Sequence, residues 1–317
     1  MLHNSQKDFI RRHIGPSEKD QEKMLKDLNF KSLDEFINST IPEKIQFKGE
    51  LNIGEPNSEY EALRKLKAIS KKNQIYSNFI GMGYYGTYTP YVILRNILEN
   101  PGWYTSYTPY QPEVAQGRLE MLLNFQQMIV DFTGMDIANA SLLDEGTAAA
   151  EAMGLSHRLD KSDSNLVFVS ENCHPQTIDV IQTRAEPMGL KVLVGNEDKV
   201  LEQLKEDIVC GVLQYPGTLG DIKDPSEAIS KIHKKNGKAI LVCDLLALSM
   251  LKTPRELGAD IAVGSSQRFG IPMGYGGPHA AFFATKDEYK RSMPGRIVGV
   301  SVDRHGNKAY RLSLQTR

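Results

Sequence analysis

The 317-residue sequence is poor in several features that point to particular classes of protein. It has only three cysteines, Cys173, Cys210 and Cys243, and they form no CxxC pair. This count predicts neither a disulfide framework nor a zinc site, and it is typical of a reducing compartment. The histidines show no HExxH-like spacing, so we expect no bound metal ion.

No run of apolar residues is long enough to span a bilayer. Residues 1–6 contain no apolar signal core, and the N-terminal region lacks an Arg/Ser-rich transit segment. Basic and acidic residues nearly cancel, at 38 Lys and Arg against 39 Asp and Glu. A balanced charge argues against general binding to nucleic acid or to a membrane surface. The sequence therefore predicts neither nucleic acid nor membrane as a partner.

The first part of the chain has the periodicity of helices. Residues 20–28 and 59–72 place apolar side chains three to four residues apart. Ser32 to Glu35 resembles a capping box that opens a short helix. Glycines and prolines before residue 59 predict a loop. We expect residues 1–75 to form a helical arm or cover and not a separate catalytic domain.

The second part, over residues 76–317, has the pattern of an α/β fold. A long amphipathic helix is predicted over 114–132, with Gly134 as its stop. Apolar β-rich runs then alternate with helical stretches. The expected strands cover 166–169, 192–194, 208–213, 239–243, 261–263 and 280–284, and the expected helices lie near 146–159, 175–188, 197–205 and 225–235. This alternation predicts a mostly parallel sheet with helices on both faces.

Two segments rich in aromatic residues and proline lie near 80–91 and 103–113. Residues 84–110 hold seven of the thirteen tyrosines. Large, rigid, half-polar side chains in irregular segments often line a pocket, although two packed connecting loops would look the same. The candidate pocket residues are Tyr84, Tyr85, Tyr107, Tyr110, Gln111 and Glu113. For Glu113, a favourable charge at a helix N-terminus is an equal alternative.

Ligands of open α/β sheets bind beyond the carboxyl ends of the strands, near helix N-termini. Gly146 and Thr147 open an alanine-rich helix that could hold a phosphate. A plain helix start explains them equally well, and the preceding Asp144 and Glu145 would repel an anion. His174 follows a predicted strand and could stack on a planar ring, or it serves only the structure.

Asp244 ends another apolar strand, where a buried carboxylate needs a partner. The protonated ring nitrogen of pyridoxal phosphate would be one, and a helix N-cap or exposed turn is the alternative. The segment 264–272 follows the next strand, where such enzymes carry the lysine that binds the cofactor as a Schiff base. No lysine occurs there: the nearest are Lys252 and Lys286. Arg268 cannot take the role, because guanidinium stays protonated.

The order of these features resembles that of fold-type I pyridoxal-phosphate enzymes. Particular motifs make the resemblance closer. Four segments, FIRRHIGP at 9–16, YTPYQPEVAQG at 107–117, IANAS at 137–141 and the glycine-proline pattern of 270–278, are similar to hallmarks of the glycine cleavage system P-protein family. The first two are highly specific, and the similarity extends from residue 9 to the last residue.

The resemblance implies that this chain is the N-terminal one of two related halves, which are fused in one chain or split into two subunits. Its fold would be a pyridoxal-phosphate transferase-like large domain that ends before the C-terminal subdomain. The other half of such proteins carries the cofactor lysine in a His-Lys-Thr-Phe segment. Here the segment at 266–269 reads Ser-Gln-Arg-Phe, which puts Gln267 at the lysine position. No catalytic residue is then expected in this chain, and the degenerate cofactor positions are Gly146, Thr147, His174 and Asp244.

For the complete protein, the resemblance implies the activity of glycine dehydrogenase (decarboxylating). Pyridoxal phosphate, bound by the C-terminal half, acts as the electron sink while glycine loses carbon dioxide. The aminomethyl group then passes to the lipoyl arm of H-protein, and the aromatic segments would line the path of that arm. The expected partners are the C-terminal half, glycine and lipoylated H-protein, in a homodimer or heterotetramer. The expected location is the bacterial cytoplasm, with the mitochondrial matrix as the alternative.

Two other functions deserve comparison. A stand-alone pyridoxal-phosphate aminotransferase or lyase is disfavoured because position 267 holds no lysine. A lysine-less paralogue with a structural or regulatory role is the alternative that the residues leave open. Co-expression with a lysine-bearing half would distinguish it from half of a glycine decarboxylase. This chain alone is expected to be inactive in either case.

Overall fold

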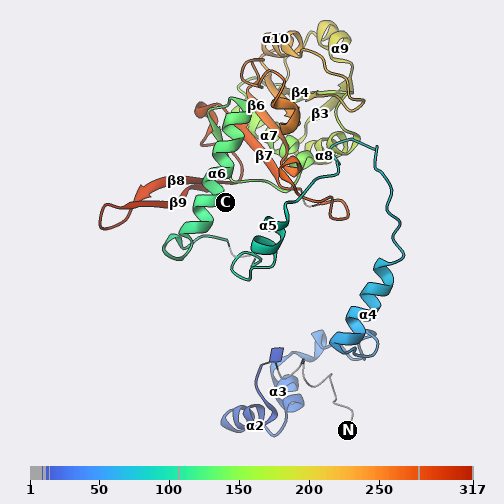
Figure 1. Cartoon of the computed structure of the whole chain (residues 1–317), viewed down its shortest axis with the longest axis vertical. Coiled ribbons are helices and arrows are strands. Elements are labelled where there is room, and N and C mark those ends of the chain that lie inside the picture. Colours follow the sequence, from blue (N-terminus) through green and yellow to red (C-terminus); the bar gives the residue numbers. More distant parts are fainter. Residues whose placement is uncertain (1–8, 10–11, 14, 106–107, 278, 316–317) are drawn as a thin grey trace. The chain divides into compact units, whose positions relative to one another are not determined.

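The structure is a computed structural model that describes residues 9, 12–13, 15–105, 108–277 and 279–315. The chain divides into two compact units, Met1–Ser77 and Asn78–Arg317 (Figure 1). This division lies close to the boundary expected at residues 75 and 76. No helix among the described residues is long and apolar enough to cross a membrane.

The first unit consists of capped helices with little buried surface. These are α2 (Glu18–Asp27), α3 (Leu33–Thr40) and α4 (Glu59–Ser70), with a short 3-10 turn, η1 (Glu43–Ile45). Each of the three α-helices begins after a serine whose hydroxyl accepts from the third helical N–H, and α2 and α4 carry full capping boxes. At Ser32 the expected capping box is only half formed, because the Glu35 carboxylate accepts from the backbone of Lys31 instead.

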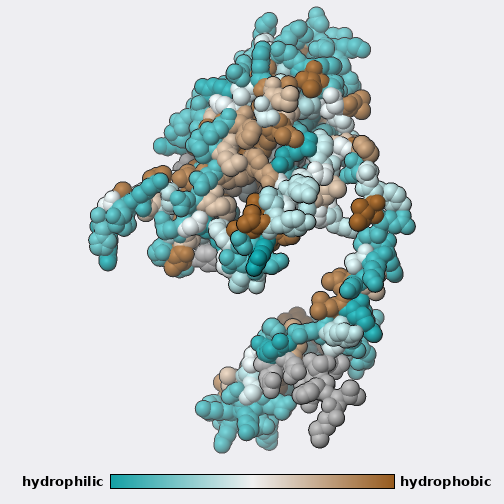
Figure 2. All heavy atoms as spheres, viewed as in Figure 1, coloured by the Kyte–Doolittle hydropathy of each residue, from teal (hydrophilic) through white to brown (hydrophobic). Residues whose placement is uncertain are grey.

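The apolar side of α4 is exposed within this unit. Leu63, Leu66 and Ile69 are 67%, 63% and 59% exposed. Figure 2 shows apolar side chains on the surface around α4. Among the described residues of the first unit, only Ser58 is buried. Surface of this kind is typical of a segment that packs against another part of a larger protein.

The second unit is built on a seven-stranded sheet of order β1-β7-β6-β5-β4-β2-β3. Five of its strands are parallel, β7 runs antiparallel to them beside β6, and the edge strand β1 pairs antiparallel with β7. The strands are β1 (Ile137–Ala138), β2 (Leu166–Ser170), β3 (Lys191–Gly195), β4 (Cys210–Tyr215), β5 (Lys238–Cys243), β6 (Ile261–Ser265) and β7 (Ala281–Thr285). All six strands expected from the sequence are confirmed in position, as is the mostly parallel sheet.

Helices cover both faces of the sheet (Figure 1). Along β5, Ile240 and Val242 enter one apolar core with α7 and α8, while Leu241 enters the other with α6, α9 and α10. This alternation is what two covered faces require. The long helices are α6 (Gln116–Thr133), α7 (Glu145–Leu159), α8 (Pro175–Ala185), α9 (Glu197–Gln203) and α10 (Ser226–Lys234), and the shorter ones are α5 (Tyr91–Ile93), η2 (Leu94–Leu98), η3 (Pro112–Val114), η4 (Glu186–Met188), α11 (Leu245–Leu248), η5 (Gln267–Phe269) and η6 (Asp287–Tyr289).

Two features of the second unit differ from the simple alternating pattern. Among the described residues between β6 and β7, the chain forms only the turn η5 and no crossover helix, and β7 returns antiparallel. A separate hairpin, β8 (Arg296–Val302) with β9 (Lys308–Gln315), follows and was not predicted. The expected stop of the long helix is confirmed, because Gly134 adopts the left-handed conformation (φ 68°) after α6.

Candidate functional site

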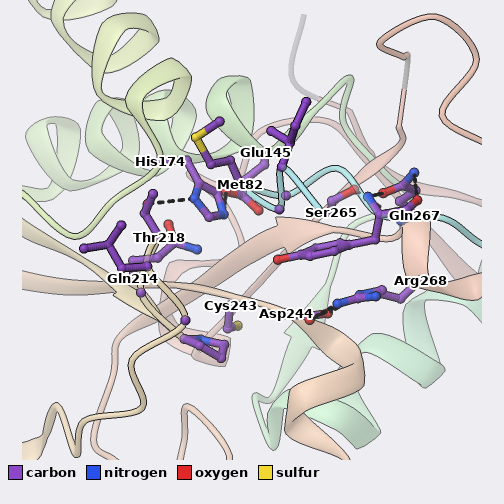
Figure 3. Close-up of a pocket in the computed structure, with 18 of the residues that line it drawn as sticks. Met82, Glu145, His174, Gln214, Thr218, Cys243, Asp244, Ser265, Gln267 and Arg268 are labelled. Carbon is purple, nitrogen blue, oxygen red and sulfur yellow. Dashed lines mark hydrogen bonds and ion pairs between the residues drawn. The ribbon is translucent and has the colours of Figure 1, made fainter. Parts of the chain in front are cut away.

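A cavity of about 510 Å³ opens at the carboxyl ends of the parallel strands (Figure 3). Its polar lining comes from consecutive strand ends: His174 after β2, Gln214 in β4, Asp244 after β5, and Ser265 in β6. The loops 79–85 and 216–220, the start of α7 and the turn η5 also line the cavity. Parallel topology therefore gathers side chains that are far apart in the sequence, as in other open α/β sheets.

Asp244 is paired with Arg268 inside this cavity. The guanidinium Nε lies 3.1 Å from Oδ1 and Nη2 lies 2.8 Å from Oδ2, and both side chains are about one-fifth exposed. The guanidinium carbon also lies 3.5 Å from the centre of the Tyr85 ring, a cation–π contact. Burial, followed by the negative charge of Asp244, raises the pKa of the Tyr85 hydroxyl. Arg268 is thus held by a fork of hydrogen bonds on one side and an aromatic face on another.

Gln267 fills the position where the resemblance expects a lysine, and it is 1% exposed. Its amide Nε2 donates to the Tyr85 carbonyl at 2.9 Å, and its Oε1 accepts from the Tyr85 N–H at 3.2 Å. Both the nitrogen and the oxygen of the Gln267 amide therefore hydrogen-bond to the backbone of the loop 79–85, which lines the cavity. A lysine ammonium has no acceptor and could not make this pair of bonds.

The lysines nearest in sequence are engaged elsewhere. Lys286 pairs with the buried Asp260, and Lys252 lies 3.9 Å from Asp224 at the surface. No lysine is among the residues that line the cavity in the described part of the chain. Among the described residues, the lysine that is missing at position 267 is therefore not replaced by a lysine from another loop.

The N-terminus of α7 was a candidate phosphate site, with a plain helix start as the alternative, and it carries acidic side chains of this chain. Asp144 caps the helix by accepting from the Thr147 N–H at 2.8 Å. The next residue, Glu145, has a pKa raised to about 7, mainly by burial; hydrogen bonds from Thr177 and Gln214 oppose the shift, and the charges of Asp244 and Asp144 add to it.

His174 lies between this helix end and the cavity. Its Nδ1 is 2.8 Å from the Thr218 hydroxyl, which itself donates to the Asn172 carbonyl. The hydroxyl can therefore only accept, and Nδ1 carries the proton. Burial lowers the pKa of His174 to about 4, so the ring is neutral at physiological pH. The 3.8 Å approach of its Nε2 to Glu145 is consequently not an ion pair under those conditions.

The aromatic candidates fall into separate places. Tyr85 lines the cavity, and Tyr84 lies beside it with its ring against His279 at 5.0 Å. Tyr110 is 58% exposed and its hydroxyl accepts from Arg296 of β8 at 2.8 Å. It does not line the cavity, nor do Gln111 and Glu113 at the turn η3, and Tyr107 lies outside the described residues.

Several cavity residues were not singled out in the sequence as part of a site, Glu145, Gln214, Thr218 and Arg268 among them. Glu145 and Arg268 were noted only for their charges, and Gln214 was not noted at all. A strand-end glutamine is common in any α/β protein, so its pattern alone carries no signal. The pairing of Arg268 with Asp244 depends on the turn η5 and could not be read from their separation in sequence.

The sheet order, the cavity at the strand ends and the positions of His174, Asp244 and Gln267 define the large domain of a fold-type I pyridoxal-phosphate enzyme. The fold resembles that of a Burkholderia pseudomallei sphingosine-1-phosphate lyase, with a TM-score of 0.55, 13% identity, and 84% of this chain and 66% of that one covered. At that identity the likeness shows the fold alone. Position 267 of this fold holds glutamine and not lysine.

The chain belongs to the glycine cleavage system P-protein family, whose family model matches residues 11–317. A Pelagibacter ubique protein named glycine dehydrogenase (decarboxylating) is 82% identical over all of this chain and 33% of its own length. A Stutzerimonas stutzeri protein of the same name is 57% identical over 98% of this chain and 32% of its own length. A crystal structure of an inhibitor-bound glycine decarboxylase (P-protein) matches with a TM-score of 0.87 and 33% identity, covering 95% of this chain and 69% of that one.

The chain therefore spans about a third of the length of these curated relatives. Pyridoxal phosphate, which the fold class implies, does not fit the residues present here. Position 267 has no amine, Asp244 already has a cation, and the helix end that would face a phosphate carries Asp144 and Glu145. The Gln214 Oε1, buried and without a hydrogen-bond partner, needs a donor, whereas a phosphate offers more acceptors.

Proposed function

We propose that this chain is the N-terminal, lysine-less part of a glycine decarboxylase that passes the aminomethyl group of glycine to lipoylated H-protein. The observation that carries the proposal is the 82% identity, over the whole chain, to a protein three times as long that is named glycine dehydrogenase (decarboxylating). The chemistry is assigned to the rest of the protein, because the cavity of this chain does not suit the cofactor. The location proposed is the cytoplasm of a bacterium.

Exposed apolar surface supports the view that this chain works as part of a larger assembly. Phe79, Tyr88, Tyr91 and Val92 are 93%, 88%, 80% and 62% exposed within the second unit. A protein does not usually leave so many large apolar side chains in water. We assign these exposed side chains to a contact with the lysine-bearing remainder of the protein, in a homodimer or heterotetramer.

Tyr84, Tyr85, Tyr107, Tyr110, Gln111 and Glu113 remain our candidates for the wall of the path taken by the lipoyl arm. Tyrosine suits such a path, because its ring is apolar and its tip is polar. Tyr110 is the best placed for a test of this role. Its hydroxyl has one defined partner, Arg296, and the ring is accessible from solvent.

Reconstitution tests the proposal. The chain, the lysine-bearing remainder and the two together would be assayed for glycine–bicarbonate exchange with H-protein and pyridoxal phosphate. We expect activity only when both parts are present. A remainder that is fully active by itself would refute a role for this chain in catalysis, and would favour the alternative of a structural or regulatory paralogue. A pair that forms a complex but never acts on glycine would also favour that alternative.

A further inference from the structure

The loss of a lysine is not the only change that separates this cavity from a cofactor site. The carboxylate that ends β5 has a cation of its own, because Arg268 forms two hydrogen bonds to Asp244. In the fold class, the ring nitrogen of pyridoxal phosphate takes that position. The guanidinium therefore stands where the positive end of the cofactor would have to enter (Figure 3).

Arg268 is held there by a chain of contacts that begins at position 267. The Gln267 amide fixes the backbone of Tyr85 through two hydrogen bonds, at 2.9 and 3.2 Å. The ring of Tyr85 in turn lies 3.5 Å from the guanidinium carbon. Neighbouring threonines secure the same loop, since the Thr87 hydroxyl donates to the Ile271 carbonyl at 2.8 Å. Rotation of Arg268 out of the cavity would break all contacts of its head group. The mostly buried Asp244 would then lose its counter-ion and keep the hydrogen bond from the Leu246 N–H at 3.1 Å.

We propose that Arg268 helps to exclude pyridoxal phosphate from this cavity, by serving as the permanent counter-ion of Asp244. Exclusion is then independent of the missing lysine. Restoring an amine at position 267 alone does not restore binding, because the ring nitrogen still has no free carboxylate to meet. The inference concerns this cavity only and stands whether or not the complete protein acts on glycine.

The test compares Gln267→Lys with Gln267→Lys/Arg268→Thr, made in the complete protein that contains this chain. Each variant is incubated with pyridoxal phosphate, reduced with borohydride, digested and mapped, and the label is read on the peptide that carries position 267. Peptide mapping reads this cavity separately from a lysine in any other part of the protein. We expect about tenfold tighter labelling of that peptide in the double variant, or about 1.4 kcal/mol.

Two further variants control for loosening of the fold. Gln267→Lys/Arg268→Gln keeps an N–H donor toward Asp244 without the charge, and it should also label more tightly than Gln267→Lys. Gln267→Lys/Arg255→Ala breaks a pair of similar geometry at the surface, Arg255 with Asp136 at 2.8 Å, and should label no better than Gln267→Lys. Equal labelling in all variants, strong or absent, would overturn the proposal. Tighter labelling with Arg255→Ala would overturn it as well, since general loosening would then explain the effect.

Discussion

Replacing Glu145 with glutamine, which exchanges a buried carboxyl for a neutral amide, is predicted to stabilise the fold at neutral pH. Glu145 is the first residue of α7, and its side chain is 14% exposed. Burial raises its pKa from 4.5 to about 7. The folded state therefore holds the proton more tightly than the unfolded state does. Ionisation of this carboxyl opposes folding, and glutamine cannot ionise.

The size of the effect follows from the pKa shift. A shift from 4.5 to about 7 corresponds to roughly 3 kcal/mol at 1.36 kcal/mol per pH unit, and the residual contact with solvent reduces it to about 2 kcal/mol. For a raised pKa, the stability contribution is complete below the unfolded value of 4.5 and is lost as pH rises through about 7. The variant should match the wild type near pH 4.5 and exceed it in stability above pH 7.

Urea unfolding of both proteins between pH 5 and 8 measures the difference. Glu186→Gln, at an exposed glutamate of η4, is the matched control and should leave the pH dependence unchanged. Subtraction of the wild-type curve removes the contributions of other titrating groups. Parallel curves for Glu145→Gln and wild type would refute the assignment of a raised pKa. A variant less stable at all pH values would show that the carboxylate is needed in its charged form.

Three further predictions follow. The wild-type chain, treated with pyridoxal phosphate and borohydride, should acquire no stoichiometric label on any one lysine, and a single labelled peptide would contradict the reading of position 267. Asp260→Asn should lower the free energy of unfolding by about 3 kcal/mol, measured by urea titration, because Asp260 accepts from His233 and Lys286 while 5% exposed. The pKa of Asp260 is lowered to about 2, so the wild type should lose this contribution to stability as pH falls from 3.8 toward 2. If the variant lost stability over the same pH range as the wild type, the assignment of this pKa shift to Asp260 would be contradicted. Tyr110→Phe should leave the melting temperature nearly unchanged and slow glycine–bicarbonate exchange by the complete protein about tenfold, or about 1.4 kcal/mol; full activity with both free lipoate and H-protein would show that the hydroxyl only pairs with Arg296.

The strands of the second unit were predictable because each is a short apolar run that must be buried on both faces. The sequence cannot show strand direction as clearly. The segment 280–284 reads like the others, yet β7 is antiparallel because the chain before it has no crossover helix. The β8–β9 hairpin was missed although β8 carries an apolar run rich in valine over 297–302; several of its side chains stay exposed, Val300 and Val302 among them at 61% and 67%.

The cavity was predictable only in outline. A strand-end histidine and a strand-end aspartate point to one edge of a parallel sheet by topology alone, and His174 and Asp244 do meet there. The partner of each is set by loops of irregular conformation, which hydrophobic periodicity does not describe. Tyr85 reaches Arg268 because Gln267 fastens its backbone, a contact between residues 182 positions apart in sequence.

The same principle of charge balance applies at both ends of the cavity. A pyridoxal-phosphate site balances a carboxylate against the ring nitrogen and a phosphate against helix N–H groups, so removal of the cofactor leaves uncompensated charge at both ends. Here Arg268 neutralises Asp244, while Asp144 accepts from the helix and burial raises the pKa of Glu145 to about 7. Side chains of this chain therefore satisfy both ends of the cavity without a ligand. For the same reason, the substitution Gln267→Lys alone should not make this cavity bind the cofactor.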